Sequence, residues 1–89
     1  MECEVRFFGA VTNATDLTEA VRVDFQGKSL EDLLNYIQIR WPKTKNYITG
    51  PKAGSVVLLV NEKAIGKGDL QKELEDGDKV SIMPFIAGG

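Results

Sequence analysis

The last two residues of the sequence, Gly88-Gly89, are the feature best suited to chemistry. Glycine has no Cβ, so a tail that ends in two glycines can pass through a narrow channel and present an unhindered α-carboxylate to another protein. That carboxylate has a pKa of about 3.5 and is a poor acyl donor until a partner activates it. Activation by ATP gives an acyl-adenylate, and attack by a sulfur donor then gives a thiocarboxylate. A Gly-Gly ending is also common as a plain chain end, so this interpretation depends on the rest of the chain.

The side chains offer little chemistry of their own. The sequence has no histidine and a single cysteine, so it cannot assemble a Ser-His-Asp or Cys-His arrangement. The acidic residues alternate with lysines or fall in turn-like segments, which is typical of solvated surface charge. We therefore expect no enzyme activity from the chain alone, and no bound cofactor or metal.

Three short motifs imitate binding or modification sites. Gly27-Lys28-Ser29 resembles the end of a phosphate-binding loop, but Arg22 stands where that motif requires a glycine. Asn13-Ala14-Thr15 matches a glycosylation acceptor, a pattern common by chance, and no secretory signal accompanies it. Residues 75–78, Glu-Asp-Gly-Asp, lack the spaced ligands of a calcium loop and are typical of a tight turn. We do not interpret any of the three as a functional site.

Cys3 is the one candidate nucleophile among the side chains. It alternates in phase with Val5 and Phe7, which places it on the apolar face of a predicted strand, where thiols are usually inert. Packing in the core is therefore the favoured interpretation. A lone cysteine also excludes an internal disulfide and is typical of a reducing compartment such as the cytosol.

Length and composition describe one small globular domain. The chain has 89 residues, of which 43% are hydrophobic and 27% charged. Its net charge of -2 gives no positive field for nucleic acid. Charges interrupt residues 1–8, so they do not form a secretory signal, and the longest apolar run, 56–60, is far short of the roughly 20 residues of a membrane-spanning helix. We expect a soluble, cytosolic protein that binds neither nucleic acid nor membranes.

Two alternating segments at the start of the chain predict strands. Apolar residues recur at every second position over residues 1–8, and a second alternating stretch falls at about 20–25. Residues 9–16 between them are rich in Gly, Asn, Thr and Asp, which favour turns. The two segments together predict an antiparallel hairpin.

One amphipathic helix is predicted after this hairpin. Ser29 is suited to its N-cap, and acidic residues in the first turn favour the helix dipole. Pro42 ends the helix near Arg40 or Trp41. The apolar stripe expected to cover the sheet consists of Leu30, Leu33, Leu34, Ile37 and Trp41.

The second half of the chain predicts the rest of the sheet. Residues 43–55 are interpreted as a connecting loop, and the aliphatic run 56–60 as a central strand buried on both faces. A helical turn is expected to place Leu70 and Leu74 under the sheet. Two further strands are predicted at 64–65 and 79–84.

The predicted element order is therefore ββαβββ, which defines the α+β class. The mixed sheet has four to five strands and one main covering helix. The domain is expected to span residues 1–84, and residues 85–89 are expected to form a flexible tail that ends in Gly-Gly.

The combination of these features resembles the MoaD and ThiS family of sulfur carriers, and most of all its molybdopterin synthase small subunits. The fold of this family is the ubiquitin-like β-grasp. The last stretch, an acidic Gly-Asp turn, a strand, a proline and a terminal Gly-Gly, is the most specific part. Two positions depart from the family pattern, since Phe85 stands where members often have a second proline, and Thr12 lies near a position often held by arginine. The segments that carry the likeness, over nearly the whole chain, are 5–9, 57–61, 74–84 and 88–89.

The resemblance implies a role for the tail. An activating enzyme of the ubiquitin-activating type (MoeB/ThiF-like) would use ATP to adenylate Gly89, which would then become a thiocarboxylate. Ile86, Ala87 and Gly88 would insert with it into the large subunit of molybdopterin synthase (MoaE-like), where sulfur passes to cyclic pyranopterin monophosphate in molybdenum or tungsten cofactor synthesis. Ubiquitin-related and archaeal small modifier proteins share the fold and the ending. Conjugation of Gly89 to lysines, transfer-RNA thiolation and thiamine synthesis are therefore alternatives.

A docking surface is predicted from strand parity. Phe8, Met83 and Phe85 have the parity opposite to the predicted core residues, and exposed aromatic and Met side chains are typical of interfaces. We expect them to contact a partner protein. The alternative is that a second layer of the fold, or the segment 43–55, covers them.

Overall fold

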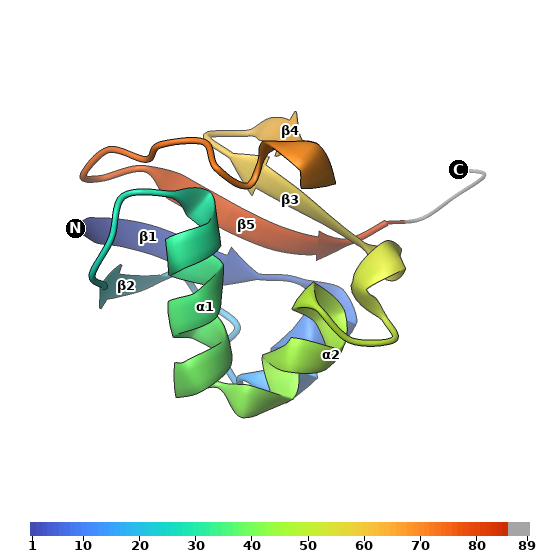
Figure 1. The fold of residues 1–89 in the computed structure, drawn as a ribbon. Coiled ribbons are helices and arrows are strands. Elements are labelled where there is room, and N and C mark those ends of the chain that lie inside the picture. Colours follow the sequence, from blue (N-terminus) through green and yellow to red (C-terminus); the bar gives the residue numbers. More distant parts are fainter. Residues whose placement is uncertain (86–89) are drawn as a thin grey trace.

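The computed structural model describes residues 1–85, and its sheet has the strand order β2-β1-β5-β3-β4 (Figure 1). β1 pairs with β5 in parallel, and the other neighbouring pairs are antiparallel, so the sheet is mixed. The predicted order of elements and the predicted hairpin between the first two strands are confirmed. The strands are β1 (Glu2–Phe7), β2 (Val21–Asp24), β3 (Val56–Val60), β4 (Lys63–Ile65) and β5 (Lys79–Pro84).

The main helix, α1 (Leu30–Arg40), begins where the sequence predicts. The backbone N–H of Asp32 donates to Ser29 Oγ at 3.1 Å, and the N–H of Ser29 donates back to Asp32 Oδ2 at 3.2 Å, which completes a capping box. Trp41 is the C-cap, and Pro42 follows it. The N-cap and the end of the helix are thus confirmed.

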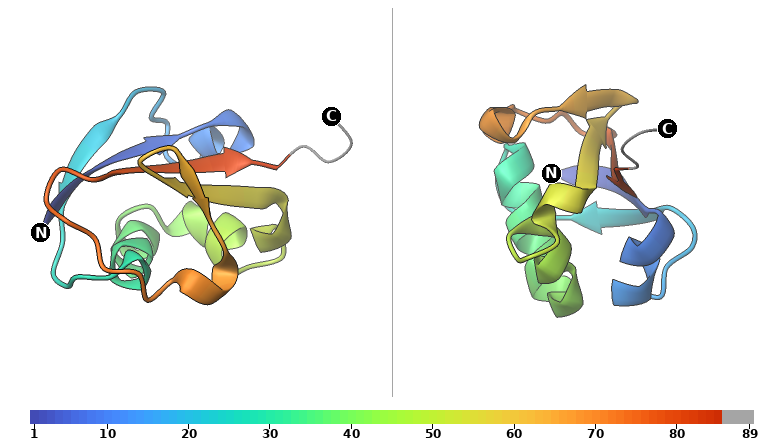
Figure 2. Two further views of the ribbon diagram at one scale, coloured as in Figure 1. Left: turned by 90° about the horizontal axis from the view of Figure 1, so that it is seen from above. Right: turned by 90° about the vertical axis from the view of Figure 1, so that its right-hand side faces the viewer.

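The core lies between α1 and one face of the sheet, and Figure 2 shows α1 and the short helix α2 (Lys45–Ile48) on that side. Trp41 extends the helical stripe, because its ring packs edge-on against Phe7 with ring centroids 5.3 Å apart. Cys3 is 1% exposed within this core, as its parity predicts. Four residues of the predicted stripe are buried: Leu30, Leu33, Leu34 and Ile37. The sheet contributes Val5, Phe7, Val23, Val60, Val80 and Ile82.

The prediction that residues 56–60 form the central strand is wrong. β5 occupies the middle of the sheet, and β3 lies between it and the edge strand β4. Only Val60 of the five residues is buried. The reason is that a hollow opens on each face of β3: Leu59 lines one, and Val56 and Leu58 line the other.

The interpretation of residues 43–55 as a connecting loop is also wrong. The segment contains most of the 3-10 helix Pro42–Thr44, the short helix α2 (Lys45–Ile48) and the 3-10 helix Ala53–Ser55. Thr44 is fully buried, and its hydroxyl is satisfied because it donates to the carbonyl of Trp41 at 2.6 Å. Tyr47 and Ile48 pack against the core. The segment therefore forms part of the covering layer.

The connection from β4 to β5 agrees with the sequence. A 3-10 turn, Lys67–Asp69, precedes Leu70, which packs against the core, and Leu74, which is buried. None of the described helices is long and apolar enough to cross a membrane.

Candidate functional site

The predicted reactive residues, Gly89 with Ile86, Ala87 and Gly88, lie outside the described residues. The structure does describe the point to which they are attached. β5, the middle strand, ends at Pro84, and Phe85 follows it (Figure 1). The attachment point is therefore at the end of the most enclosed strand of the sheet.

Two neighbouring strands hold this attachment point from both sides. β1 runs parallel to β5, so the residues after it reach the same end, where the N–H of Phe8 donates to the carbonyl of Ile82 at 3.0 Å. β3 runs antiparallel, so its start lies beside the end of β5, and the N–H of Phe85 donates to the carbonyl of Ser55 at 2.6 Å. The last described residue is thus anchored to the domain by its own backbone.

Side chains on the face of the sheet away from α1 form a shallow hollow of about 330 Å³. Phe8, Leu59 and Met83 form most of its apolar part and come from three neighbouring parts of the sheet, and Val80 also lines it. The Arg6 guanidinium lies 5.9 Å from the centroid of the Phe8 ring. Charged side chains border this apolar part: Glu4, Arg6, Glu62 and Lys79. An apolar centre with a charged rim is the usual anatomy of a protein–protein interface.

The structure brings together two of the three residues predicted for docking. Phe8 and Met83 are half-buried and line the same hollow. Phe85 does not line it, and its side chain is 56% exposed next to the attachment point. The segment 43–55 does not line this hollow either. That Phe8, Met83 and Phe85 contact a partner protein remains a prediction.

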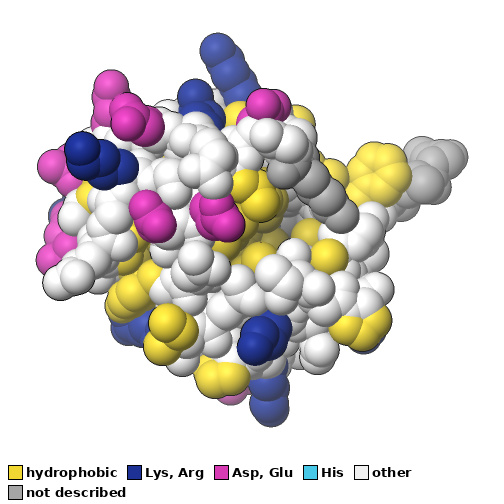
Figure 3. All heavy atoms as spheres, in the orientation of Figure 1, with side chains coloured by type: hydrophobic (Ala, Val, Ile, Leu, Met, Phe, Trp, Pro, Cys, Tyr) yellow, Lys and Arg dark blue, Asp and Glu magenta, His cyan; other side chains and the backbone are white. Residues whose placement is uncertain are grey.

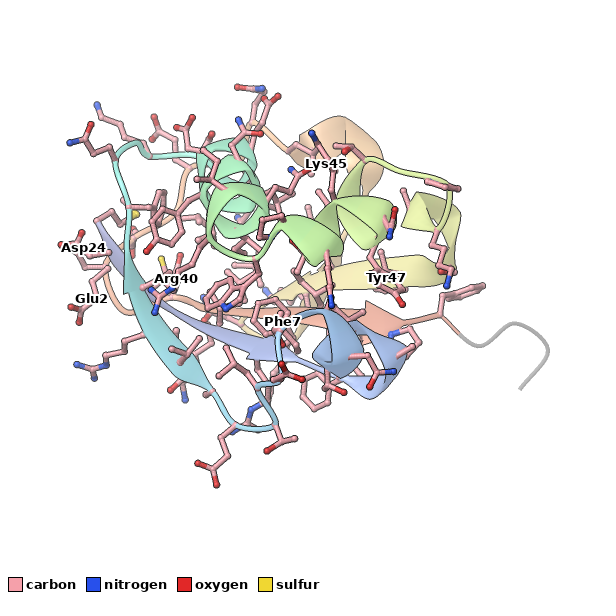
Figure 4. The ribbon with its side chains drawn as sticks, turned by 90° about the horizontal axis from the view of Figure 1, so that it is seen from below. Glu2, Phe7, Asp24, Arg40, Lys45 and Tyr47 are labelled. Carbon is pink, nitrogen blue, oxygen red and sulfur yellow. The ribbon has the colours of Figure 1, made fainter. Side chains whose placement is uncertain are left out.

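A second hollow, of about 230 Å³, opens on the side of the helices. It lies between α2 and β3, and Figure 3 shows hydrophobic side chains in its floor. Tyr47 of α2 lines it, with Lys52 Nζ 5.5 Å from the ring centroid. Figure 4 places Tyr47 at the end of the molecule where the chain leaves β5, and Glu2 and Asp24 at the opposite end.

Two backbone donors of the motif Gly27-Lys28-Ser29 are already engaged within the domain. The N–H groups of Lys28 and Ser29 both donate to Asp32 Oδ2, at 3.0 and 3.2 Å. These hydrogen bonds hold the pKa of the Asp32 carboxyl below its ordinary value. The segment is therefore the cap of α1, as the sequence suggests.

In the acidic turn at residues 75–78, a carboxylate oxygen likewise accepts a hydrogen bond from the backbone of the turn itself. Asp78 Oδ2 accepts from the N–H of Glu75 at 2.9 Å, and Gly77 takes a φ of 88°. Nowhere in residues 1–85 do three His, Cys, Asp or Glu side chains gather as metal ligands would.

Burial raises the pKa of the nearby Cys3 thiol, and the charges of Asp78 and Asp76 raise it further.

Sequence reasoning placed Gly9 and Thr12 in a turn but missed that they lie beside the end of β5, and it missed Ser55. Gly9 takes a φ of 59° directly after β1, and its carbonyl accepts from the Thr12 hydroxyl at 2.7 Å. The glycine after a predicted strand was the available signal for this turn. Ser55 contributes its backbone carbonyl, and because every residue has one, the residue type gives no signal for this contact.

The fold and the anchored end of β5 together define a ubiquitin-like protein of the β-grasp class, with a mixed five-stranded sheet and one main helix. The model of the ThiS family matches residues 5–89. The chain is also 30% identical over 90 residues to the molybdopterin synthase sulfur carrier subunit of Mycobacterium tuberculosis, with 100% of this chain and 99% of that protein covered. The chain therefore belongs to the ThiS family of small sulfur carriers.

Two solved structures illustrate the range of similar proteins. The small archaeal modifier protein 1 of Methanosarcina acetivorans is 26% identical, with a TM-score of 0.78 and 99% and 96% of the two chains covered. A chain from the complex of subunits 1 and 2 of the molybdopterin-converting factor of Helicobacter pylori is 27% identical, with a TM-score of 0.69 and both chains fully covered. Structural similarity thus extends to an archaeal modifier protein and to a chain of a molybdopterin-converting factor.

Proposed function

We propose that this chain is the sulfur-carrying small subunit of a molybdopterin synthase, and that the α-carboxyl group of Gly89 carries the sulfur. The observation that supports it most is the 30% identity, over essentially the full length of both proteins, to a molybdopterin synthase sulfur carrier subunit. The described part of the chain fits this role, because a rigid sheet anchors the segment that precedes the tail. The proposed compartment is the cytoplasm.

The proposed chemistry has two steps. A carboxylate oxygen of Gly89 attacks the α-phosphorus of ATP on an activating enzyme of the ubiquitin-activating type (MoeB/ThiF-like), and pyrophosphate leaves. A hydrosulfide ion then attacks the acyl carbon, and AMP leaves with the original carboxylate oxygen, which yields the thiocarboxylate. This chain supplies the acyl group and its partners supply ATP and the catalytic side chains.

The proposed partners are the activating enzyme and a large synthase subunit of the MoaE type. A relative from Helicobacter pylori has been solved as a complex of the two subunits of a molybdopterin-converting factor, which supports a two-subunit assembly. We propose that Phe8 and Met83 contact these partners through the hollow that they share, and that the exposed Phe85 adds to the contact beside the tail.

A second candidate function is protein modification, in which a lysine amine replaces sulfide as the nucleophile and Gly89 forms an isopeptide bond. The similarity to an archaeal small modifier protein at a TM-score of 0.78 favours it. Both functions share the adenylation step and differ only in the nucleophile that follows.

Intact-mass spectrometry tests the proposal. The chain is incubated with the activating enzyme, ATP and sulfide, and the expected product has one oxygen replaced by sulfur. The matched control lacks Gly88-Gly89 and should fold normally but stay unchanged. Because the proposal requires Gly89 to end the mature chain, the mass of the protein isolated from its source is measured first. An additional residue after Gly89, or an unchanged mass with an active enzyme, contradicts the proposal.

A second stage separates the two functions. The thiocarboxylate form is mixed with the large synthase subunit and cyclic pyranopterin monophosphate, and dithiolene formation is the result expected for the synthase role. Peptide mapping of cell extracts searches for Gly89 linked to lysine side chains. Such conjugates, together with no dithiolene formation, favour the modifier function.

A further inference from the structure

The contact between Gly9 and Pro84 joins two residues from opposite ends of the sequence. Gly9 takes a φ of 59°, and a Cβ built on it lies 2.5 Å from Pro84 Cγ and 3.1 Å from Pro84 Cδ. Carbon atoms in proteins do not approach as closely as 2.5 Å without a shift, and the proline ring has little freedom to move away. The Pro84 ring therefore occupies space that only a glycine leaves open.

Each side of this contact is braced by its own hydrogen bonds. On the Gly9 side, the Thr12 hydroxyl donates to the carbonyl of Gly9 at 2.7 Å. On the other side, the N–H of Phe85 donates to the carbonyl of Ser55 at 2.6 Å. Ser55 is itself held, because its hydroxyl donates to the carbonyl of Lys52 at 2.6 Å. Pro84 thus lies between two segments held by hydrogen bonds: the turn after β1, which contains Gly9, and the residues before β3, which include Ser55.

We propose that Gly9 is a positioning residue for the tail: by admitting the Pro84 ring, it fixes the point and direction from which residues 86–89 leave the sheet. This inference rests on the proposed function. Four residues span at most about 14 Å when fully extended, so a displacement at their base shifts the region that the carboxylate of Gly89 can reach. Misplacement of a reacting group by about 1 Å can lower a reaction rate about 100-fold.

The test compares Gly9→Ala with Gly77→Ala. Both glycines have positive φ values, 59° and 88°, so alanine strains the backbone at either position. Only Gly9 has a close neighbour, because nothing lies within 4 Å of a Cβ on Gly77. The double variant Gly9→Ala/Pro84→Ala removes the ring atoms that clash and leaves the backbone strain. It therefore separates a positioning effect from a loss of stability.

The kinetic measurement is ATP–pyrophosphate exchange catalysed by the activating enzyme with the full-length chain as substrate. Gly9→Ala should lower kcat about 100-fold with a smaller change in KM, because Leu59 and Met83 of the hollow keep their places and the carboxylate is the group displaced most. Gly77→Ala should react like the wild type, and the double variant should recover to the level of Gly77→Ala. Equal kinetics of Gly9→Ala and Gly77→Ala, or no recovery in the double variant, overturns the proposal.

A second measurement needs no partner. Hydrogen exchange of the Phe85 amide, followed by NMR, should be protected in the wild type and Gly77→Ala, faster in Gly9→Ala and restored in the double variant. Equal protection in all four chains shows that Gly9 does not fix the end of β5. A wild-type chain that supports no pyrophosphate exchange overturns the proposed function instead, which keeps the two failures distinguishable.

Discussion

Replacement of Met83 by glutamate is the most direct test of the docking face. Met83 lies opposite Val57 in the pairing of β3 with β5, and it lines the hollow with Phe8 and Leu59. The substitution places a charge in the apolar centre of this face. Because Met83 is only half-buried in the free chain, the fold should tolerate the change, as it does most surface substitutions.

The expected loss of affinity follows from burial. Complete burial of a methionine side chain contributes about 1.5–3 kcal/mol, and about half of this, roughly 1 kcal/mol, is still available when a partner covers Met83. A carboxylate buried there without a partner costs at least a further 1–3 kcal/mol or so, because charged groups cost more than neutral ones. The sum of about 2–4 kcal/mol corresponds to an increase in Kd of about 30-fold or more.

The matched control is Ile39→Glu. Ile39 is 80% exposed on α1, which covers the opposite face of the sheet, so this variant also exchanges an exposed apolar side chain for one negative charge. Titration calorimetry with the large synthase subunit, and separately with the activating enzyme, measures both variants against the wild type. Met83→Glu should bind weakly to at least one partner and Ile39→Glu normally. If the two variants bind equally well, the docking face assigned here is incorrect.

Three further predictions concern the fold. Ile82→Ala should lower the free energy of unfolding by about 2–4 kcal/mol, since Ile82 is 0% exposed in the core. Urea denaturation measures this loss, and the control is Ile39→Ala, at a position that is 80% exposed. Equal losses in the two variants contradict the packing of Ile82. The pKa of Asp32 is lowered by backbone hydrogen bonds, so the carboxylate stabilises the fold above the ordinary aspartate pKa and this contribution disappears as the pH falls through the lower native value. Asp32→Asn should remove this part of the acid dependence of unfolding, and parallel pH profiles of the two chains refute it. The raised pKa of buried Cys3 predicts slow alkylation by iodoacetamide in the folded chain and rapid alkylation in urea, and equal rates at one pH exclude the burial.

The position of two of the residues predicted for docking could be deduced from sequence. The parity of Phe8 and Met83 relative to the core residues placed both on the face away from α1, and the structure confirms that placement. Parity did not determine Phe85, because it lies beyond the end of β5, where the alternation of faces no longer applies. The roles of Gly9 and Ser55 could not be predicted, since they arise from contacts between segments distant in the sequence.

The sequence by itself determined the features that depend on neighbouring residues. These include the α1 cap at Ser29, the end of the helix before Pro42 and the buried faces of β1 and β5, because capping and the two-residue period of a strand are local properties. The sequence could not determine whether β3 or β5 is the middle strand of the sheet, since an apolar run does not specify which strands pair with it. Tertiary structure decided that order through the parallel pairing of β1 with β5, which brings Gly9 to Pro84 and so holds the base of the tail.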